Sequence, residues 1–434
     1  MSSVFVRSFG CSSNAVDGEV MAGCLRSRGF VLVPTVEEAD VVIYNTCGVK
    51  MPTEDRMIHL LRQVPADKRL IVAGCLPLIH LSRLSREVRF DALVGPASGE
   101  QIVDVVGRVL NGEKYVALMD SLCSKPSLNL PRVNVNPLVR IVPIAYGCVG
   151  ECSYCCVRFA RGRLRSFGPT EVAEYVSKNL REGAKEFWLT GQDVASYGLD
   201  LGVDIVDLLR KVCCVDAVGE FWIRVGMSTP NLLRPLVKAF GDFLTDHEGC
   251  GRVFEFLHVP IQSGDDGILT LMRRRYSVDD FKQVISAFRR VMPRVTIATD
   301  VIVGFPGESE QAFGNTIQLL KEVKPDIVNV SKFFARPGTE AERMKGKVEL
   351  GELKRRSEII ARLAREIGLE KNKAWVGWSG QILIEEKGEK RSSWVGRNFA
   401  YKPIVVRCNE DLLGRFLNVR VVEAHQSHLL GKVI

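Results

Sequence analysis

The most specific segment of the chain is Gly147-Cys148-Val149-Gly150-Glu151-Cys152-Ser153-Tyr154-Cys155, in which three cysteines are spaced C-x3-C-x2-C. This spacing differs from the cysteine runs of ferredoxins and from the paired C-x2-C motifs of zinc sites. Three thiolates so spaced can hold three corners of a cubane iron–sulfur cluster and leave the fourth iron without a protein ligand. The segment therefore predicts a [4Fe–4S] cluster with one open iron. A zinc knuckle without its fourth ligand, or thiols that pack as small hydrophobes, are the alternatives.

The cysteines follow an apolar run, residues 140–146, that predicts a short strand. They therefore lie beyond the carboxyl end of a strand, where α/β folds place their chemistry. Further strands, separated by amphipathic helices, are predicted at 186–190, 220–225, 254–259, 295–303 and 327–333. Six such units predict a partial (β/α)6 TIM-like barrel over residues 140–371, with a lateral opening for a large substrate.

Residues 1–125 also alternate short strands and helices, which predicts a doubly wound parallel sheet. Three of its predicted strands end on a cysteine, at Cys11, Cys47 and Cys75, which are 36 and 28 positions apart. Because the carboxyl ends of parallel strands meet at one edge, the three thiols should converge as a second cluster site. The alternative is that each cysteine is buried at a strand end because it packs well there.

The end of the chain predicts a small β-barrel behind a linker. Prolines interrupt residues 126–139, which are predicted to be the linker. Residues 372–434 contain five short runs of alternating polarity, which predict an OB-like barrel of a kind often used on RNA. Within it, Arg397, Tyr401 and Lys402 place charge and an aromatic ring on one hairpin, which suits phosphate contact and base stacking. A barrel that only caps the neighbouring domain is the alternative.

Composition is that of a soluble globular protein of several domains, with 434 residues, 46% hydrophobic and 25% charged. No apolar run approaches the roughly 18 residues of a membrane span, and the first residues lack a signal-peptide pattern. We therefore expect a cytoplasmic protein without a membrane partner. In that compartment thiols stay reduced, so 13 cysteines indicate metal or redox chemistry more than disulfides.

Basic residues are clustered, although the net charge of +8 is modest. Arg161 and Arg163 follow the cysteine segment closely, and further runs occur at 273–275, 354–356 and 387–397. Such clusters suit a polyanion such as RNA, although a solvated face is the commoner meaning of any single run.

The C-x3-C-x2-C segment with Tyr154 before its last cysteine resembles the signature of the radical S-adenosylmethionine (SAM) superfamily. The resemblance implies that the open iron is chelated by SAM, which an electron from the cluster cleaves to methionine and a 5′-deoxyadenosyl radical. It also implies SAM contacts at the ends of later strands: the amino group at the second strand, the methionine carboxylate at the third, and the adenine near the fifth. The residues so implied, with Tyr154, are Thr190, Gly191, Gln192, Arg224, Gln262 and Gly304.

The order of the three modules resembles the methylthiotransferase family over essentially the whole chain, with a tail similar to the RNA-binding TRAM domain. Segments 45–54, 160–162, 224–227 and 398–403 are most similar to the archaeal and eukaryotic branch that acts on threonylcarbamoyladenosine in tRNA. Ser12, directly after Cys11, departs from the bulkier residue of many members and leaves the polarity around that cluster in doubt.

The resemblance implies 2-methylthiolation of N6-threonylcarbamoyladenosine beside the anticodon, two [4Fe–4S] clusters and SAM. It also implies tRNA, a reducing donor such as a ferredoxin or flavodoxin, and a source of sulfur as partners. Three other functions remain open: methylthiolation of isopentenyladenosine in tRNA, methylthiolation of a ribosomal-protein aspartate, and a non-catalytic iron–sulfur RNA-binding protein.

Overall fold

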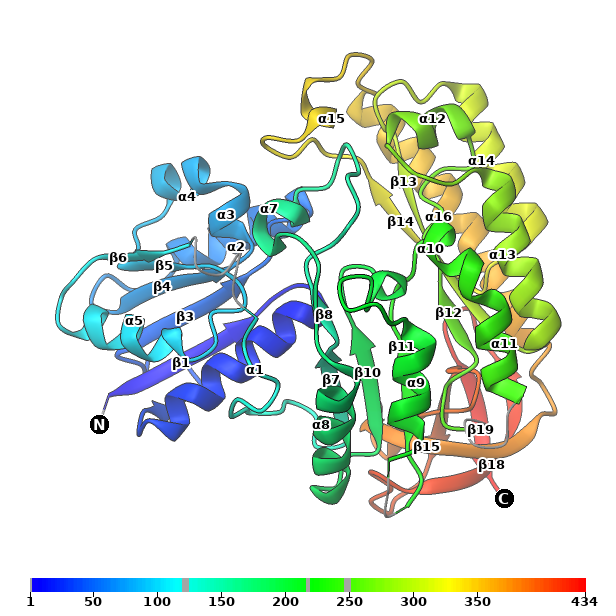
Figure 1. Ribbon diagram of the computed structural model, residues 1–434, viewed down its shortest axis with the longest axis horizontal. Coiled ribbons are helices and arrows are strands. Elements are labelled where there is room, and N and C mark those ends of the chain that lie inside the picture. Colours follow the sequence, from blue (N-terminus) through cyan, green and yellow to red (C-terminus); the bar gives the residue numbers. More distant parts are fainter. Residues whose placement is uncertain (1, 119–124, 216–218, 246–250) are drawn as a thin grey trace.

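The computed structural model describes residues 2–118, 125–215, 219–245 and 251–434. Figure 1 shows an N-terminal α/β layer on the left, a half-barrel of strands and helices on the right, and a small β-barrel beneath the half-barrel. This arrangement confirms the predicted α/β class and the order of its parts.

The N-terminal sheet is parallel throughout, with strand order β2-β1-β3-β4-β5-β6. The apolar run of β3 is buried along its whole length, as expected for a central strand covered on both faces. The order reverses between β1 and β3, and ligand sites in doubly wound sheets lie at such a reversal. The strands are β1 (Ser3–Ser8), β2 (Val31–Leu32), β3 (Val41–Thr46), β4 (Arg69–Gly74), β5 (Ala92–Val94) and β6 (Tyr115–Ala117).

Helices cover both faces of this sheet. One core contains residues of α1 (Ser12–Ser27) and α5 (Gln101–Leu110), and the other contains residues of α2 (Met51–Arg62) and α4 (Leu81–Glu87). The doubly wound prediction is therefore confirmed. Strand β6, at the edge of the sheet, was not among the predicted strands.

The central domain is a crescent of parallel strands, as predicted, but its ladder is interrupted. One sheet has the order β11-β10-β7 and the other β12-β13-β14, and between them the described residues show one isolated parallel bridge, Ile223 to Val253. All six predicted strands are present, and this one bridge links the third strand to the fourth. The strands are β7 (Val139–Pro143), β10 (Glu186–Thr190), β11 (Trp222–Val225), β12 (Phe256–His258), β13 (Thr296–Val303) and β14 (Ile327–Lys332).

Amphipathic helices cover the convex side of the crescent in Figure 1. They are α8 (Pro169–Arg181), α9 (Ile205–Cys213), α10 (Pro230–Leu233), α11 (Val237–Thr245), α13 (Val278–Val291), α14 (Glu310–Val323) and the long α16 (Leu350–Lys373). A short helix, α12 (Asp266–Leu271), follows β12. The cysteine segment lies between the short strand β8 (Ala145–Tyr146) and helix α7 (Val157–Arg161), and β8 pairs antiparallel with β9 (Arg165–Ser166).

The C-terminal strands close into a barrel of order β15-β16-β17-β19-β18, which confirms the predicted module. The small barrel packs beneath the amino ends of the crescent strands: the Lys185 ammonium group donates to the Gly414 carbonyl at 2.6 Å just before β10. It is therefore on the side opposite the cysteine segment (Figure 1). Its strands are β15 (Ser379–Lys387), β16 (Ser393–Arg397), β17 (Pro403–Arg407), β18 (Phe416–Ala424) and β19 (Leu429–Val433).

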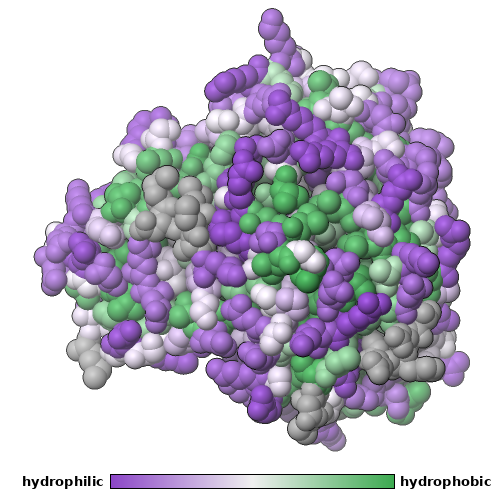
Figure 2. Space-filling view, viewed as in Figure 1, coloured by the Kyte–Doolittle hydropathy of each residue, from purple (hydrophilic) through white to green (hydrophobic). Residues whose placement is uncertain are grey.

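Within the described ranges, no helix is both long and apolar enough to cross a membrane. Figure 2 shows a face that is mostly hydrophilic, with apolar areas near the middle of the view.

Candidate functional site

The loop that carries Cys148, Cys152 and Cys155 is fixed from two sides. On one side the Cys148 N–H donates to the Gly162 carbonyl at 3.3 Å. On the other side Ser153 donates through its backbone N–H to Met272 and through its hydroxyl to Leu271, at 3.1 and 2.7 Å. Gly147 begins the loop with φ +77°, and a Cβ there would lie 1.9 Å from the Arg163 carbonyl oxygen. The sequence therefore needs glycine at this turn.

Backbone N–H groups point at the sulfurs of this loop. The Gly150 N–H donates to Cys148 Sγ at 3.2 Å. Burial raises the pKa of Cys148 to about 11, and the Gly150 N–H opposes the shift. Burial likewise raises the pKa of Cys155, while the N–H groups of Val157 and Arg158 lower it. N–H donors stabilise thiolate ligands and tune the potential of an iron–sulfur cluster, so this loop fits such a cluster.

A partly buried arginine, Arg274, contacts the cysteine loop. The Arg274 guanidinium lies 5.6 Å from the ring centroid of Tyr154 and donates to the Tyr154 hydroxyl. Its neighbours pair with acids, Arg273 with Glu340 at 2.6 Å and Arg275 with Glu151 at 3.8 Å. Arg274, and at longer range Arg275, therefore contact the cysteine loop, while Arg273 and Arg275 are exposed and their contact with a polyanion stays a prediction.

Cys11, Cys47 and Cys75 follow β1, β3 and β4, which are neighbours in the sheet. Cys47 and Cys75 are buried and Cys11 is exposed. Burial, with smaller contributions from the charges of Cys11 and Cys47, raises the pKa of Cys75 to about 12, so the three thiols are close enough to interact. Gly10 has φ +116°, and a Cβ there would lie 2.7 Å from Cys47 Cβ. The parallel topology thus brings the three thiols to one edge.

Asn14 organises this edge. Its amide donates to the Phe9 and Thr46 carbonyls at 2.9 and 3.0 Å, which ties the ends of β1 and β3 together. Its carbonyl oxygen accepts from Cys75 Sγ at 3.5 Å.

Across the part of the chain that the structure describes, no three His, Cys, Asp or Glu side chains lie close enough to hold one metal ion. A cubane cluster is wider than one ion, so its ligands stand further apart.

The segment after Cys11 contacts the central domain at the end of β10. Ser12, next to Cys11, hydrogen-bonds through its hydroxyl to the Thr190 hydroxyl at 2.9 Å. The Gln192 amide donates to the Ser13 hydroxyl at 3.3 Å. Thr190 and Gln192, implied SAM contacts, therefore lie at the boundary with the domain that carries Cys11. Sequence reasoning missed Ser12 and Ser13 as contacts, because their partners are 178 and 179 positions away.

Cys156 is buried in an apolar cluster shared with Cys75 and Ala160. This position agrees with our interpretation of Cys156 as a packing residue.

The other implied SAM contacts differ in their surroundings. Space beside Gly191 is open, since an added Cβ would meet nothing closer than 3.8 Å. Gln262 has φ +70°, a left-handed backbone that is costly without glycine and that often marks a functional position. A Cβ on Gly304 would lie 1.8 Å from Leu353 Cδ2, so helix packing is sufficient to explain that glycine. Tyr154 packs edge-on against Phe305, with ring centroids 6.2 Å apart.

Arg224 is surrounded by aromatic rings. Its guanidinium carbon lies 5.3, 4.9 and 5.2 Å from the ring centroids of Trp188, Phe256 and Tyr401. Its Nε has no hydrogen-bond partner in the described chain. Tyr401 belongs to the small barrel. Arg224 pairs with Trp188 in the sheet, so it lies deeper in the crescent than Thr190, at the strand end.

The structure corrects three of the five predicted RNA contacts. Arg161, Tyr401 and Lys402 are 2%, 8% and 4% exposed, so their side chains cannot reach a phosphate. Lys402 pairs with Asp326 at 2.8 Å. Arg397 is half-buried and lies 3.3 Å from Glu385. Arg163 is exposed beside the cysteine loop and stays a predicted contact.

The hairpin that we predicted to bind RNA instead packs against the amino end of the crescent. The Tyr401 ring lies 4.8 and 5.0 Å from those of Phe254 and Phe256. The Glu255 N–H donates to the Phe399 carbonyl at 2.8 Å. The alternative of a capping barrel therefore describes this hairpin better.

Buried acids form a second set of residues that the sequence did not reveal. Asp193, after β10, accepts from the Thr229 hydroxyl at 2.6 Å, and burial raises its pKa. Glu54 accepts from His80 and Arg83, both at 2.8 Å, and from Arg336 of the central domain. A lone acid within a helix gives no local signal of burial, because the partners are distant in sequence.

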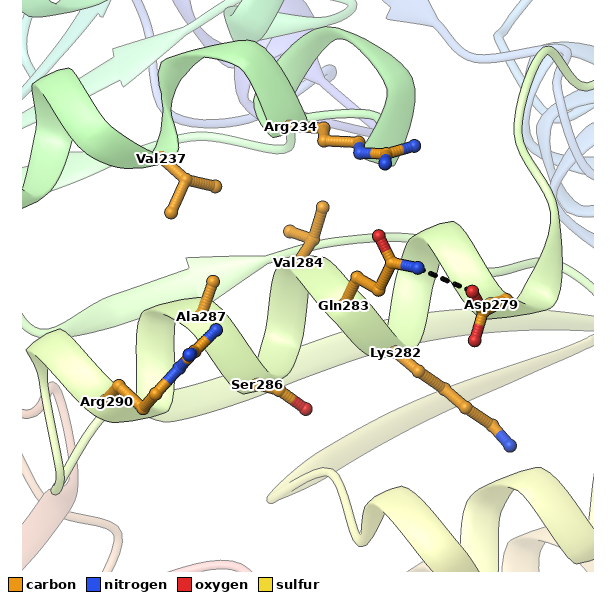
Figure 3. Close-up of a pocket in the computed structure, with 9 residues that line it drawn as sticks. All are labelled: Arg234, Val237, Asp279, Lys282, Gln283, Val284, Ser286, Ala287 and Arg290. Carbon is orange, nitrogen blue, oxygen red and sulfur yellow. Dashed lines mark hydrogen bonds between the residues drawn. The ribbon is translucent and has the colours of Figure 1, made fainter.

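A groove on the outer surface lies between α11 and α13, and no cysteine is among the residues that line it (Figure 3). Arg234, Lys282 and Arg290 line it, and Gln283 donates to Asp279 within it. It lies on the helical side of the crescent and not at the carboxyl ends of strands, so we assign the chemistry to the cysteine sites.

Comparison with known families divides the chain as its folds do. Residues 142–320 match the radical SAM superfamily, residues 3–95 match a family described as Uncharacterized protein family UPF0004, and residues 373–434 match the TRAM domain. Among solved structures, a radical S-adenosylmethionine methyltransferase, TsrM, from Kitasatospora setae has a similar fold, with a TM-score of 0.56 and 13% identity over 79% of this chain and 77% of that chain.

Full-length relatives are more similar in sequence. The chain is 37% identical over 436 residues, covering 100% of both chains, to a Pyrococcus horikoshii protein named "Probable threonylcarbamoyladenosine tRNA methylthiotransferase". It is 31% identical to the Homo sapiens protein named "Threonylcarbamoyladenosine tRNA methylthiotransferase", over 99% of this chain and 74% of that protein. The chain therefore belongs to the radical SAM superfamily and, within it, to the threonylcarbamoyladenosine tRNA methylthiotransferase family.

Proposed function

We propose that this protein is a tRNA methylthiotransferase that converts N6-threonylcarbamoyladenosine, next to the anticodon, to its 2-methylthio derivative (ms2t6A). The observation that supports this most directly is the Ser12–Thr190 hydrogen bond, which joins the residue after Cys11 to the strand end where a SAM contact is predicted, in a chain that matches its archaeal relatives from end to end. An enzyme that makes a radical at one site and handles sulfur at another needs both sites beside one substrate atom.

The target bond explains why such a pair of sites is needed. The C2–H bond of adenine is neither acidic nor electrophilic, so a positioned acid or base cannot activate it. SAM bound at a reduced cluster supplies a 5′-deoxyadenosyl radical, which abstracts such a hydrogen. The protein's contribution is binding, orientation and exclusion of water.

We assign Cys148, Cys152 and Cys155 as the ligands of the SAM-binding cluster and Cys11, Cys47 and Cys75 as those of an auxiliary [4Fe–4S] cluster. The first set fits because backbone N–H groups are directed at two of its sulfurs. The second fits because the three thiols follow neighbouring strand ends at one sheet edge, where the absence of a side chain on Gly10 leaves room for Cys47.

For SAM we propose contacts from the strand ends that surround the cysteine loop. Thr190, Gly191 and Gln192 lie beside the N-terminal domain, and Gln262 and Gly304 follow β12 and β13. Tyr154 orders the loop by packing on Phe305. Arg224 stays a predicted carboxylate contact, although its aromatic neighbours already account for its position.

The substrate nucleotide must leave its stack to reach the site. A loop nucleotide beside the anticodon does so at a cost of about a few kcal/mol, because it is not paired. Arg163, exposed next to the loop, is the predicted phosphate contact near the opening. The proposal also requires a low-potential electron donor such as a ferredoxin or flavodoxin and a source of sulfur, and it places the protein with tRNA in the cytoplasm.

The test is mass spectrometry of nucleosides after anaerobic reaction. Reconstituted and reduced protein is incubated with SAM and with tRNA that carries threonylcarbamoyladenosine, and the matched control is the same tRNA without that modification. We expect ms2t6A in the first reaction and no methylthiolated adenosine in the second. Modification of isopentenyladenosine tRNA instead, or SAM cleavage with no change in any tRNA, would contradict the proposal.

A further inference from the structure

Arg161 lies beside the auxiliary cysteines although it belongs to the central domain. It ends α7, six positions after Cys155, and its side chain is 2% exposed. Its guanidinium lies 2.6 Å from the Asp17 carboxylate and donates to the Asn14 carbonyl at 2.7 Å. That same Asn14 oxygen accepts from Cys75 Sγ. The guanidinium and a proposed cluster ligand therefore share one hydrogen-bond acceptor.

One donor of this guanidinium has no protein acceptor. Arg161 Nη1 is buried and makes no hydrogen bond to any described residue. A buried donor without a partner costs about 1–3 kcal/mol or more, so a site that keeps one usually provides an acceptor by another route. The carboxylate oxygens of Asp17 beside it also lack a hydrogen bond, so this donor can be satisfied either by Asp17 or by the sulfur atoms of an anionic cluster held at the neighbouring cysteines.

A second arginine of the central domain, Arg336, contacts the N-terminal domain. Arg336, after β14, pairs with Glu54 on α2, and both side chains are at most 5% exposed. Its charge lowers the pKa of Cys47, as does that of Arg161, against the larger upward effect of burial. Arg161 likewise lowers the pKa of Cys75. The two cations thus act on thiols that belong to a different domain.

We propose that Arg161, assisted by Arg336, is the positive counter-charge that the central domain supplies to Cys11, Cys47 and Cys75, and that it raises the reduction potential of the cluster they hold. A cluster ligated by thiolates is anionic and becomes more so when it accepts an electron. A permanently charged guanidinium in a buried, low-dielectric setting favours that reduced form. The inference rests on the auxiliary cluster proposed above.

A purely structural role is the competing explanation. Arg161 and Asp17 join the two domains, and breaking a buried ion pair is strongly destabilising. Two substitutions separate the roles because they break the same pair with opposite changes of charge. Arg161→Met removes a positive charge near the thiols, whereas Asp17→Asn removes a negative one. An electrostatic role predicts potential shifts of opposite sign, and a docking role predicts shifts of the same sign.

The experiment uses the full-length chain with Cys148, Cys152 and Cys155 replaced by alanine, so that only the auxiliary cluster is present. Iron and sulfide content is measured first, and the potential is then found by anaerobic redox titration followed by electron paramagnetic resonance. We expect Arg161→Met to shift the potential to more negative values, Asp17→Asn to more positive values, and Arg161→Lys to leave it near that of the parent. Arg336→Met should give a smaller negative shift.

Each outcome has one meaning. Absence of a cluster in the parent contradicts the proposed second cluster and therefore the proposed function. If a cluster is present and its potential shifts in the same direction in Arg161→Met and Asp17→Asn, only this inference is overturned. The same holds if the potential shifts in neither variant. If Arg161→Met does not fold, the sign of the Asp17→Asn shift together with that of Arg336→Met decides between the two roles.

Discussion

The two cysteine sites differ in how the chain builds them. Cys148, Cys152 and Cys155 lie within eight consecutive residues, and the loop supplies its own N–H donors to two of the sulfurs. The auxiliary cysteines are gathered by a parallel sheet from three strand ends, and buried cations reach two of them from another domain. A local motif carries much of its environment with it, whereas a site made by topology depends on the domains around it.

The largest expected effect follows from removing the three cysteines of the C-x3-C-x2-C loop. With Cys148, Cys152 and Cys155 all replaced by alanine, we expect iron to fall to roughly half and SAM cleavage to be abolished, since cysteine thiolates hold such clusters. Iron analysis and chromatography of 5′-deoxyadenosine measure the two effects. Cys156→Ala is the matched control, because that buried neighbouring thiol is assigned to packing, and it should keep both. Persisting cleavage in the triple variant would show the loop assignment to be wrong.

Removing the auxiliary cysteines should have a different effect. Alanine at Cys11, Cys47 and Cys75 should leave 5′-deoxyadenosine production in place and abolish ms2t6A formation, because the radical is made at the other site. Cys24→Ala, a buried thiol of α1 away from the sheet edge, is the control and should modify tRNA normally. If the triple variant still forms ms2t6A, the N-terminal cysteines are only packing residues.

A substitution at Glu54 tests how far the auxiliary cysteine site depends on the neighbouring domain. We expect Glu54→Gln to destabilise the protein by about 3–5 kcal/mol, because it leaves buried Arg336 without its charge partner. Methylthio transfer should fall more than SAM cleavage, since the pair joins the auxiliary domain to the crescent. Urea unfolding measures the stability. Glu87→Gln is the control; its pairs are more exposed, so it should cost much less stability than Glu54→Gln.

The pH dependence of this effect has a definite sign. Burial raises the pKa of Glu54, but hydrogen bonds from Arg336 and Arg83 outweigh it and leave the pKa below the usual 4.5. A depressed carboxyl pKa stabilises the fold above the unfolded value and loses that contribution as the pH falls through the folded value. The stability difference between wild type and Glu54→Gln should therefore shrink below about pH 4.5. A difference that is constant down to strongly acid pH would contradict the assignment.

The smallest expected effect concerns RNA contact near the local site. Arg163→Ala should weaken tRNA binding and lower the slope of log affinity against log salt by about 0.7–0.9, which is the loss of one phosphate contact. Arg181→Ala is the control, since that exposed arginine ends α8, at the amino side of the crescent. Filter binding at several salt concentrations measures both slopes. Equal slopes for Arg163→Ala and wild type would remove Arg163 from the interface.

The sequence alone determined the parts of this protein that depend on neighbouring residues. The C-x3-C-x2-C spacing identified the SAM-binding loop, and the alternation of apolar runs with amphipathic helices predicted both α/β units and the five strands of the small barrel. The convergence of Cys11, Cys47 and Cys75 also followed, because a parallel sheet brings successive strand ends to one edge. Spacing and periodicity are properties of the chain itself, so they can be read before it folds.

Only the tertiary structure decided which charged residues are buried. Arg161 was interpreted as an RNA contact because it follows the cysteines in a basic run, but its partner Asp17 lies 144 positions away. Lys402 and Tyr401 were assigned to RNA because they place a charge and an aromatic ring on one hairpin, but they are enclosed where the small barrel meets the crescent. A charge is stable in the interior only when a distant partner compensates for its lost hydration, and such pairing leaves no trace in the local sequence.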